Sequence, residues 1–348
     1  MRTIKLCMAG FGNVGRRFAR LMEDKREELA RKCGVDVQLV GVVTRSKGAL
    51  VAPEGLGWAH VLEMDDGLGR FDPGDPAFRA WSPARMIEAC AAAGTDAFLE
   101  LTTLSIDDGQ PATGYIEHAL EHGLHVITAN KGPEAWHYDR LAKLAAERGR
   151  EFLFETIVMD GTPVFNLVRE TLHGNVISGM RGILNGTTNF VLAQLEAGVS
   201  YEDAIEEAQR MQLAEADPSM DVDGWDGAAK ICALANVLMD ARLTPRDVVV
   251  ESISSVTRAD IERAKGKGLR IKYVCKAERD EKGKPRLSVR PEMLAVGDAL
   301  RDVDGTSAAL TLYTDLAGEI IIVQTDPGIL QTAYGVYSDL LTLIKRTA

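Results

Sequence analysis

A glycine-rich hexapeptide near the amino terminus constrains the fold more than any other feature of the chain. GFGNVG follows the mostly apolar run 4–9 and opens a helical repeat of apolar side chains. Dinucleotide binding requires this order of strand, glycine turn and helix, because the turn admits the pyrophosphate and the helix dipole favours its charge. The motif therefore predicts a nucleotide-binding turn, with a ligand-free turn as the alternative. Its members are Gly10, Phe11, Gly12, Asn13, Val14 and Gly15.

The end of the second expected strand, 35–43, indicates which dinucleotide is bound. Folds of this kind usually place a carboxylate there to hold the adenosine ribose. This chain instead has Thr44, Arg45, Ser46 and Lys47. An arginine and two hydroxyl groups suit a 2′-phosphate, so NADP is favoured, and use of NAD stays compatible with the pattern. The alternative is that the two basic residues are solvated loop charges.

The first 150 residues alternate short apolar strands with helical patterns, which predicts a Rossmann-like, doubly wound parallel sheet of the α/β class. Polar residues follow two of these strands, at the edge where such sheets bind ligands. They are Thr102 and Thr103 after FLEL, and the stretch ending in Lys131 after HVI. The expected strands are 3–9, 35–43, 96–101, 124–128 and 152–155.

Beyond residue 150 strands and helices mix, which predicts an α+β domain for substrate binding and dimerisation over 151–314. The dinucleotide-binding domain is expected at 1–150, completed by a C-terminal helix within about 315–348. Helices are expected over 201–212 and 225–239. The charged run 276–286 is interpreted as a solvated hairpin tip.

The segment 215–230, EADPSMDVDGWDGAAK, concentrates carboxylates before an apolar helix that carries one lysine. Asp226 and Lys230 are four residues apart and share one helical face. Apolar neighbours favour the neutral form of the lysine and the carboxylates favour its charged form, so Lys230 could exchange a proton with a substrate. An ordinary helix start with an i,i+4 ion pair is the alternative.

Composition excludes several classes of partner. The net charge of the 348 residues is −11, and no basic stripe interleaved with aromatic residues offsets it, which argues against nucleic acid. Apolar stretches are too short for a membrane span and no secretory signal is evident, so we expect a cytoplasmic protein. Its 5 cysteines form no CxxC pair and are expected to be reduced.

Taken together, several separated motifs resemble those of the homoserine dehydrogenases. They occur in family order: GFGNVG at 10–15, ELTT at 100–103, HVITANKGP at 125–133, GILNGTTNF at 182–190, AEADPSMDVDGWDGAAK at 214–230 and LQTAYGVYSDLL at 330–341. The resemblance implies NAD(P)-dependent, reversible interconversion of L-homoserine and L-aspartate 4-semialdehyde, on the route to threonine and methionine. It also implies a homodimer. The chain resembles the short form, without a C-terminal sensor domain.

The resemblance also implies roles for individual residues. Lys230 would be the main acid/base, Lys131 would assist from the cofactor side, and Asp226 would position Lys230. The carboxylates of Glu215 and Asp221 would bind the substrate ammonium, and Asp217 is a weaker candidate because the following Pro218 indicates a turn. The pocket and cofactor contacts implied by position are Gly186 and Thr187 for substrate, and Thr44, Arg45, Thr102, Thr103, Lys131 and Gly328 for the dinucleotide.

The family further implies a structural sodium ion held by backbone carbonyls after the last strand of the first domain. Carbonyl oxygens suit a hard cation. The matching positions are Glu155, Val158, Asp160 and Thr162. The segment 324–328, QTDPG, departs from the glycine-rich turn of many relatives and is expected to alter the cofactor grip or turnover.

Two other functions remain open at this stage. The lysines and ammonium-binding acids would also suit a dehydrogenase of a related small amino-acid-derived alcohol, aldehyde or amine. A non-catalytic NADP-binding sensor is a second alternative, although it would have no need of the proton-transfer residues.

Overall fold

The computed structural model describes residues 1–105 and 107–348, which form two compact units. Unit 1 contains 1–133, 137–163 and 328–348, and unit 2 contains 134–136 and 164–327. These bounds differ from the expected domain limits at 150 and 315 for two reasons. The segment 155–157 packs against the C-terminal helix, and the strand 319–324 pairs inside the second sheet.

A 7-stranded sheet in the order β4-β3-β2-β1-β5-β6-β7 forms the centre of unit 1. Pairings from β2 through β1 to β7 are parallel, while β3 and β4 add an antiparallel edge. The strand order reverses at β1, between β2 and β5, and open α/β sheets bind ligands at the carboxyl edge of such a point. The strands are β1 Arg2–Ala9, β2 Val35–Thr44, β3 Gly48–Leu56, β4 Phe78–Arg79, β5 Ala97–Glu100, β6 His125–Thr128 and β7 Phe152–Leu153.

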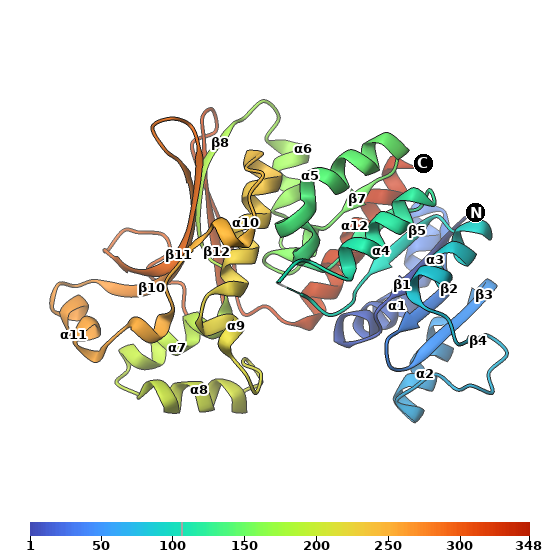
Figure 1. The fold of residues 1–348 in the computed structure, drawn as a ribbon, viewed down its shortest axis with the longest axis horizontal. Coiled ribbons are helices and arrows are strands. Elements are labelled where there is room, and N and C mark those ends of the chain that lie inside the picture. The colour runs from blue at the N-terminus through green and yellow to red at the C-terminus, as the bar shows by residue number, and fades with distance from the viewer. Residues whose placement is uncertain (106) are drawn as a thin grey trace. The chain divides into compact units, whose positions relative to one another are not determined.

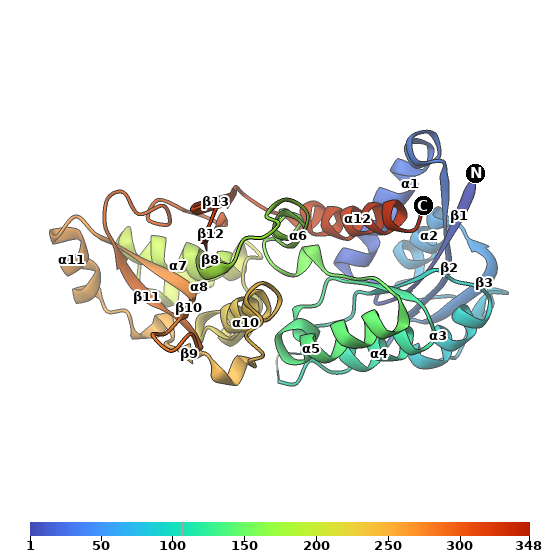
Figure 2. The same cartoon turned by 90° about the horizontal axis from the view of Figure 1, so that it is seen from above.

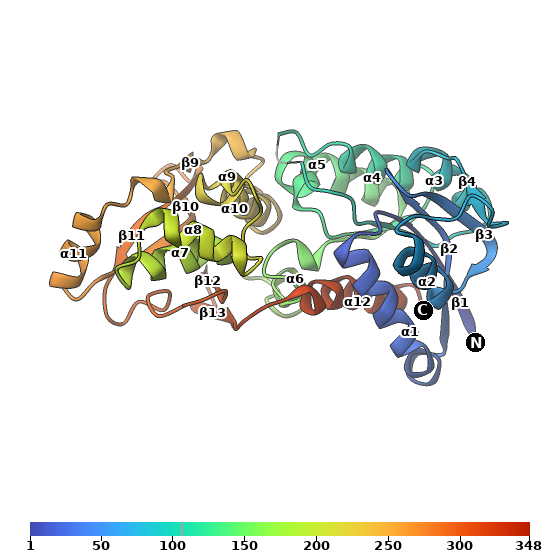
Figure 3. The ribbon, with the colours of Figure 1, turned by 90° about the horizontal axis from the view of Figure 1, so that it is seen from below.

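Helices cover both faces of this sheet. Figures 2 and 3 show α1 and α12 together on one side, and α3, α4 and α5 in a row on the other. The side with α1 and α12 forms a continuous apolar core that includes Phe18, Met22 and Leu340. The helices are α1 Asn13–Cys33, α2 Trp58–Leu68, α3 Pro83–Ala92, α4 Ala112–Glu121, α5 Lys131–Arg148 and α12 Ile329–Arg346, with a 3-10 turn η1 at Glu155–Ile157.

Unit 2 is built on a 6-stranded mixed sheet in the order β13-β12-β8-β10-β11-β9. Helices α7 and α10 pack against its strands, and Figure 1 shows α10 alongside them. The strands are β8 Ile177–Ile183, β9 Val249–Val250, β10 Arg270–Arg279, β11 Pro285–Leu294, β12 Ala308–Thr314 and β13 Glu319–Gln324. The helices are α6 Phe165–Thr171, α7 Gly186–Glu196, α8 Tyr201–Arg210, α9 Ser219–Val222, α10 Trp225–Met239 and α11 Arg258–Gly266, with η2 at Pro245–Asp247 and η3 at Ile253–Ser255.

Close packing fixes α10 on the sheet. A Cβ on Gly227 would lie 3.0 Å from a methyl group of Val289 and 3.1 Å from the sulfur of Cys275. Gly224, just before the helix, has φ +89°, and a Cβ there would lie 2.1 Å from the hydroxyl of Tyr273. Small residues thus let this helix, which carries Asp226 and Lys230, approach the strands closely.

The α/β class with a second α+β unit is confirmed, as is the hairpin at 276–286, where β10 and β11 pair antiparallel. Strand β3 was outside the expectation because GALVAPEGL contains two glycines, a proline and a glutamate instead of a regular alternation. Among the described residues, no helix combines the length and apolar character that crossing a membrane requires.

Candidate active site

A pocket of about 360 Å³ opens at the carboxyl edge of the first sheet, where β1, β2 and β5 end. Glycine-turn residues form its base, hydroxyl and basic side chains after β2 form one wall, and residues after β5 form another. Tyr115 of α4 also lines it. The members that the sequence predicts are Gly10, Phe11, Gly12, Thr44, Arg45, Thr102 and Thr103.

The glycines of the turn differ in what their surroundings allow. Gly10 has φ +95°, and a Cβ there would lie 2.1 Å from the carbonyl oxygen of Leu101. At Gly15 a Cβ would lie 2.8 Å from the Gly10 carbonyl oxygen, so helix and turn touch. Gly12 has nothing within 4 Å of that position. The backbone is therefore crowded at Gly10 and Gly15 but open at Gly12, as a bound phosphate would need.

A buried carboxylate organises the edge between β5 and β6. Glu100 accepts a hydrogen bond from the backbone N–H of Thr102 at 2.9 Å and bonds from the hydroxyls of Thr102 and Thr128. Thr128 in turn accepts from the backbone of Asn130 at 3.0 Å, and the Asn130 side chain caps α5 at Gly132. Burial raises the pKa of Glu100, and these hydrogen bonds partly offset the rise.

The basic wall after β2 separates into one tethered residue and one exposed residue. Lys47 forms an ion pair with the buried Asp65 and donates to the Phe11 carbonyl at 3.3 Å. Arg45 is exposed, and no contact within the described part of the chain holds its guanidinium. Lys47 is therefore held by contacts within the protein, whereas Arg45 can contact a ligand at the rim of the pocket.

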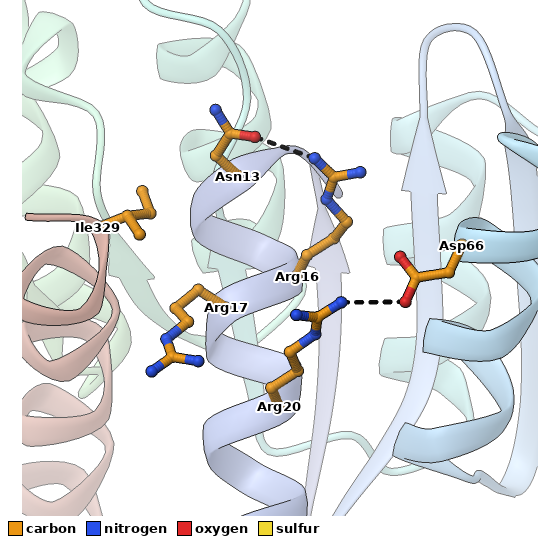
Figure 4. A pocket seen from close by; sticks show the side chains of 6 residues that line it. All are labelled: Asn13, Arg16, Arg17, Arg20, Asp66 and Ile329. Atoms are coloured by element: carbon orange, nitrogen blue, oxygen red, sulfur yellow. Dashed lines mark hydrogen bonds and ion pairs between the residues drawn. The ribbon is translucent and has the colours of Figure 1, made fainter. Parts of the chain in front are cut away.

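A second hollow of about 430 Å³ lies beside the first turns of α1. Figure 4 shows that three arginines of α1 line it, together with Asn13, Asp66 of α2 and Ile329 of α12. Arg16 donates to the Asn13 side chain at 3.0 Å, and Arg20 pairs with Asp66 at 3.0 Å. Asn13 therefore faces this neighbouring hollow, and Arg16 borders both.

Unit 2 brings Asp221, Asp226 and Lys230 together around one asparagine. The side-chain amide of Asn185 donates to Asp221 at 2.7 Å and to Asp226 at 2.8 Å. Its carbonyl oxygen accepts from the backbone of Thr188 at 2.8 Å and so caps α7. One residue thereby ties the start of α7 to both carboxylates.

Lys230 lies at the centre of this cluster. Its Nζ pairs with Asp226 at 2.9 Å and donates to the carbonyl oxygen of Leu184 at 2.6 Å. Its side chain is 18% exposed and that of Asp226 is 11% exposed. The amine is therefore partly desolvated and oriented by two oxygen atoms, which fixes where it could give or take a proton.

Asp221 is the carboxylate of the cluster whose ionisation is disfavoured. Burial and the neighbouring Asp226 raise its pKa, while Asn185, Thr187 and Lys230 act in the opposite direction. The Thr187 hydroxyl donates to the Leu213 carbonyl at 2.7 Å. Gly186 begins α7, with Thr306 close to where a Cβ would be, at 3.4 Å.

Two of the remaining predicted acids occupy other surroundings. Glu215 is exposed, and its carbonyl oxygen accepts from the Gln209 amide at 3.1 Å. Asp217, the weaker candidate, is exposed and accepts from the backbone of Ser219 at 3.0 Å. The backbone N–H of Ser219 lowers the pKa of Asp217. Neither carboxylate shares the hydrogen bonds described for the Asn185 cluster.

In unit 1, Lys131 is the first residue of α5, directly after the capping Asn130. Gly328 precedes α12 and donates its N–H to the side chain of Gln331 at 3.1 Å. Gly328 is absent from the residues that line the 360 Å³ pocket, as are Asn13, Val14, Gly15 and Lys131.

The segment expected to hold a cation is a buried turn packed on α12. Met159 and Asp160 both have positive φ, at 56° and 51°, and the Thr162 N–H closes the turn on the Met159 carbonyl at 3.0 Å. The Asp160 side chain accepts from Thr332 at 2.7 Å. The N–H of the buried Glu155 donates to Asp339 at 2.8 Å, and Val158 is fully buried.

Comparison with known proteins identifies the family of this chain. The model of the homoserine dehydrogenase family matches residues 163–341. A curated NAD(+)-dependent homoserine dehydrogenase from Pseudomonas canavaninivorans is 35% identical over 346 residues, which cover 98% of this chain and 96% of that protein. The chain belongs to the homoserine dehydrogenase family. It is thus an NAD(P)-dependent oxidoreductase that acts on a CH–OH group and interconverts L-homoserine and L-aspartate 4-semialdehyde.

Solved homoserine dehydrogenases share the fold over nearly the whole chain. A putative homoserine dehydrogenase from Archaeoglobus fulgidus superposes with a TM-score of 0.86 at 30% identity, covering 98% of this chain and 99% of that one. A hyperthermophilic archaeal homoserine dehydrogenase in complex with NADPH gives 0.83 at 28% identity, covering 99% and 98%. The relatives therefore include one named for NAD(+) and one solved with NADPH.

Sequence reasoning missed three residues that organise these two regions: Glu100 and Asp65 at the sheet edge of unit 1, and Asn185 in unit 2. A signal existed for Asn185, because an asparagine before a Gly-Thr-Thr helix start is a typical N-cap. Glu100 is visible only as one acid at the end of an apolar strand. Asp65 lies 18 residues from Lys47 with no local pattern to connect them.

Proposed function

We propose that Lys230 is the principal acid/base of the homoserine dehydrogenase reaction and that Asp226 positions it. The observation that carries this role is the 2.9 Å contact of its Nζ with Asp226 and the 2.6 Å bond to the Leu184 carbonyl. Lys131 assists as the second lysine. Its backbone starts α5 beside the network of Glu100, Thr128 and Asn130.

In the oxidising direction, neutral Lys230 accepts the hydroxyl proton of homoserine as the carbon gives up a hydride. In the reducing direction, the ammonium returns that proton to the aldehyde oxygen. The bound nicotinamide supplies the hydride acceptor or donor. Asp226 stabilises the protonated amine. The Leu184 carbonyl accepts one of its N–H groups, which fixes where the remaining N–H groups point.

Carboxylates of the acid-rich segment bind the substrate ammonium. We assign this role to Asp221 and Glu215, with Gly186 and Thr187 lining the substrate pocket. The Asn185 amide already bonds Asp221 from one side, which leaves acceptor capacity for a cation on the other lone pairs of the carboxylate. An ammonium group would also favour the ionised form of Asp221.

The preferred cofactor under this proposal is NADP. Arg45, together with the Thr44 and Ser46 hydroxyls, lies at the rim of the nucleotide pocket. Thr44 accepts from the Lys47 N–H at 2.7 Å, so its own O–H can still donate to a phosphate. The glycine turn and the hydroxyls of Thr102 and Thr103 would contact the rest of the dinucleotide, and Gly328 would lie on the nicotinamide side.

A monovalent cation, sodium, is proposed at the 155–162 turn. The positive φ values of Met159 and Asp160 turn successive carbonyl groups away from the alternating directions of a β-strand. The carbonyl oxygens that would hold the ion are those of Glu155, Val158, Asp160 and Thr162. Sodium chloride should then raise the midpoint of thermal unfolding more than choline chloride does at equal ionic strength.

A homodimer is proposed through the second sheet. The edge strand β13 exposes Ile321 and Val323, which are 46% and 53% exposed. An apolar edge strand of this kind is a natural surface for pairing with a second copy. Light scattering of Ile321→Asp/Val323→Lys should report a monomer where the unmodified chain gives a dimer.

The test of the proposed reaction is the absorbance of reduced nicotinamide during oxidation of homoserine. L-homoserine should be oxidised and D-homoserine should not, with NADP used more efficiently than NAD. Turnover that is equal for both enantiomers would contradict an ammonium site built by Asp221 and Glu215, and a preference for NAD would contradict the role of Arg45.

A further inference from the structure

We propose that Glu88, His118 and His122 form a site for a divalent transition metal ion of the zinc type. Glu88 lies on α3 and the two histidines on α4, helices that pack together in unit 1. One ring nitrogen of each histidine and one carboxylate oxygen of Glu88 lie within 4.8 Å of one another. Two imidazoles and a carboxylate are ligands that zinc accepts, with water completing the coordination.

The tautomer of His122 is already suited to coordination. His118 and His122 are four residues apart on one helix face, with ring centroids 4.3 Å apart. Nδ1 of His122 lies 2.8 Å from the carbonyl oxygen of His118. Because a carbonyl can only accept, Nδ1 carries the hydrogen and Nε2 of the neutral ring keeps its lone pair. Metal-binding histidines are commonly oriented by such a bond.

His118 adds a buried nitrogen that has the Glu88 carboxylate as a neighbour but makes no hydrogen bond to it. Its Nε2 is buried and makes no hydrogen bond among the residues that the structure describes. It lies 3.4 Å from Oε1 of Glu88. The other carboxylate oxygen of Glu88 accepts from Arg85 at 3.2 Å, which orients the carboxyl group. A metal between His118 and Glu88 would satisfy the nitrogen, and the negative charge of the Glu88 carboxylate would offset part of the repulsion between the metal and the nearby Arg85 guanidinium.

The C-terminal end of α4 also favours a bound cation. The helix ends at Glu121, and His122 is its C-cap. The partial negative charge of a helix C-terminus favours a cation there. Tetrahedral zinc brings ligand nitrogens and oxygens to about 3.4 Å from one another, so the ligands must close by rotamer changes. His122 is exposed, which permits that movement.

A metal here would tie together two helices that border the nucleotide pocket. Pro83 at the start of α3 and Tyr115 on α4 both line that pocket. Binding would therefore fix this wall of the pocket from behind. None of the residues proposed for homoserine oxidation belongs to this metal site.

Titration calorimetry of the chelator-treated full chain with zinc chloride tests the proposal. One zinc ion should bind per chain, and His122→Gln and Glu88→Gln should each weaken binding at least about tenfold, which is what loss of even an outer-shell partner costs. His60→Gln is the matched control, because His60 is an exposed histidine paired with Asp75 at 2.9 Å. It should bind zinc as the unmodified chain does.

Cobalt(II) gives an independent readout, since its visible absorption bands report ordered coordination. These bands should appear with the unmodified chain and with His60→Gln and be lost with His122→Gln, while circular dichroism verifies that each variant is folded. Equal zinc affinity for the unmodified chain and His122→Gln, or no zinc binding at all, would overturn the proposal.

Discussion

The carboxyl edge of the first sheet and the Asn185 cluster of unit 2 are both polar, but they are constructed differently. The first presents backbone: a glycine turn, a helix start and hydroxyls anchored by one buried carboxylate, Glu100. The second presents charged side chains, Asp221, Asp226 and Lys230, held by Asn185. A phosphate can be bound by backbone N–H groups, whereas proton transfer needs a titratable side chain.

This difference predicts which substitutions each region tolerates. At the sheet edge, which is built from backbone, one added carbon can destabilise the fold or block a ligand. Many changes of side-chain charge have little effect there, because solvent screens them. In the side-chain cluster, a single charge change alters chemistry with little change of shape. Six variants, compared in four experiments, set these two behaviours against each other.

Lys230→Ala should have the largest effect, because it removes the amine that we propose exchanges the proton. We expect kcat to fall about 10²–10⁴-fold, as for loss of a general acid/base, while the Kd for NADP stays nearly unchanged. Steady-state assays and fluorescence titration of NADPH measure the two quantities. Lys267→Ala, which removes an exposed lysine at the end of α11, is the control. A kcat within a few-fold of the unmodified enzyme would remove Lys230 from its role.

The second variant pair separates packing from ligand approach within one motif. Gly10→Ala places a Cβ against the Leu101 carbonyl at a positive φ, so it should destabilise the fold by about 2–4 kcal/mol. Gly12→Ala meets open space and should cost at most about 0.5 kcal/mol, yet weaken NADP binding about tenfold by obstructing the pyrophosphate. Chemical denaturation and cofactor titration measure both effects. If Gly12→Ala binds NADP normally, the dinucleotide does not approach this turn closely.

Arg45→Ala tests the exposed basic side chain at the pocket rim whose guanidinium is held by no hydrogen bond or ion pair within the described part of the chain. Loss of a charged hydrogen bond to the 2′-phosphate should raise the KM for NADP about 10–100-fold and leave the KM for NAD unchanged. Arg31→Ala removes an exposed arginine from the last turn of α1 and serves as the control. Equal changes for NADP and NAD would show that Arg45 does not distinguish the ribose phosphate.

Local pattern explains which parts of this architecture were predictable. The apolar repeat around Lys230 predicts a helix over 225–239, and α10 has those bounds. The strands expected at 3–9 and 35–43 correspond to β1 and β2 within one residue at each end. The edge strands β3 and β4 escape prediction because their neighbours in the sheet, not their own alternation, hold them in place.

Site predictions follow the same rule. The spacing of Asp226 and Lys230 on one helix turn gives their contact directly. Contacts between distant segments leave no local signal: Asn185 reaches Asp226 across 41 residues, and Glu100 reaches Thr128 across 28. Such partners follow from how strand ends and helix starts converge in the fold.

Asp221→Asn should have a small effect on stability, and the sign of that effect distinguishes the side-chain cluster from ordinary surface charge. Burial and Asp226 raise the pKa of Asp221 above its usual 3.8, so the native state holds this proton more tightly than the unfolded chain. The contribution of this carboxyl group to stability is greatest at low pH and is lost as pH rises from 3.8 through the raised native pKa. Asp221→Asn should therefore be more stable than the unmodified chain at pH 7, by about 0.5–1 kcal/mol, and close to it at pH 4.

Asp217→Asn, four residues earlier, should behave in the opposite way. The Ser219 N–H lowers the pKa of Asp217, so its ionised form stabilises the native state above its usual pKa and that contribution is lost as pH falls. Its variant should lose stability at pH 7, and only Asp221→Asn should also raise the KM for homoserine. Thermal unfolding midpoints between pH 4 and 7.5 measure both trends. If the stabilities of the two variants change in the same direction, the surroundings of Asp221 do not disfavour its ionised form. The substrate ammonium would then have no electrostatic repulsion in the cluster to relieve.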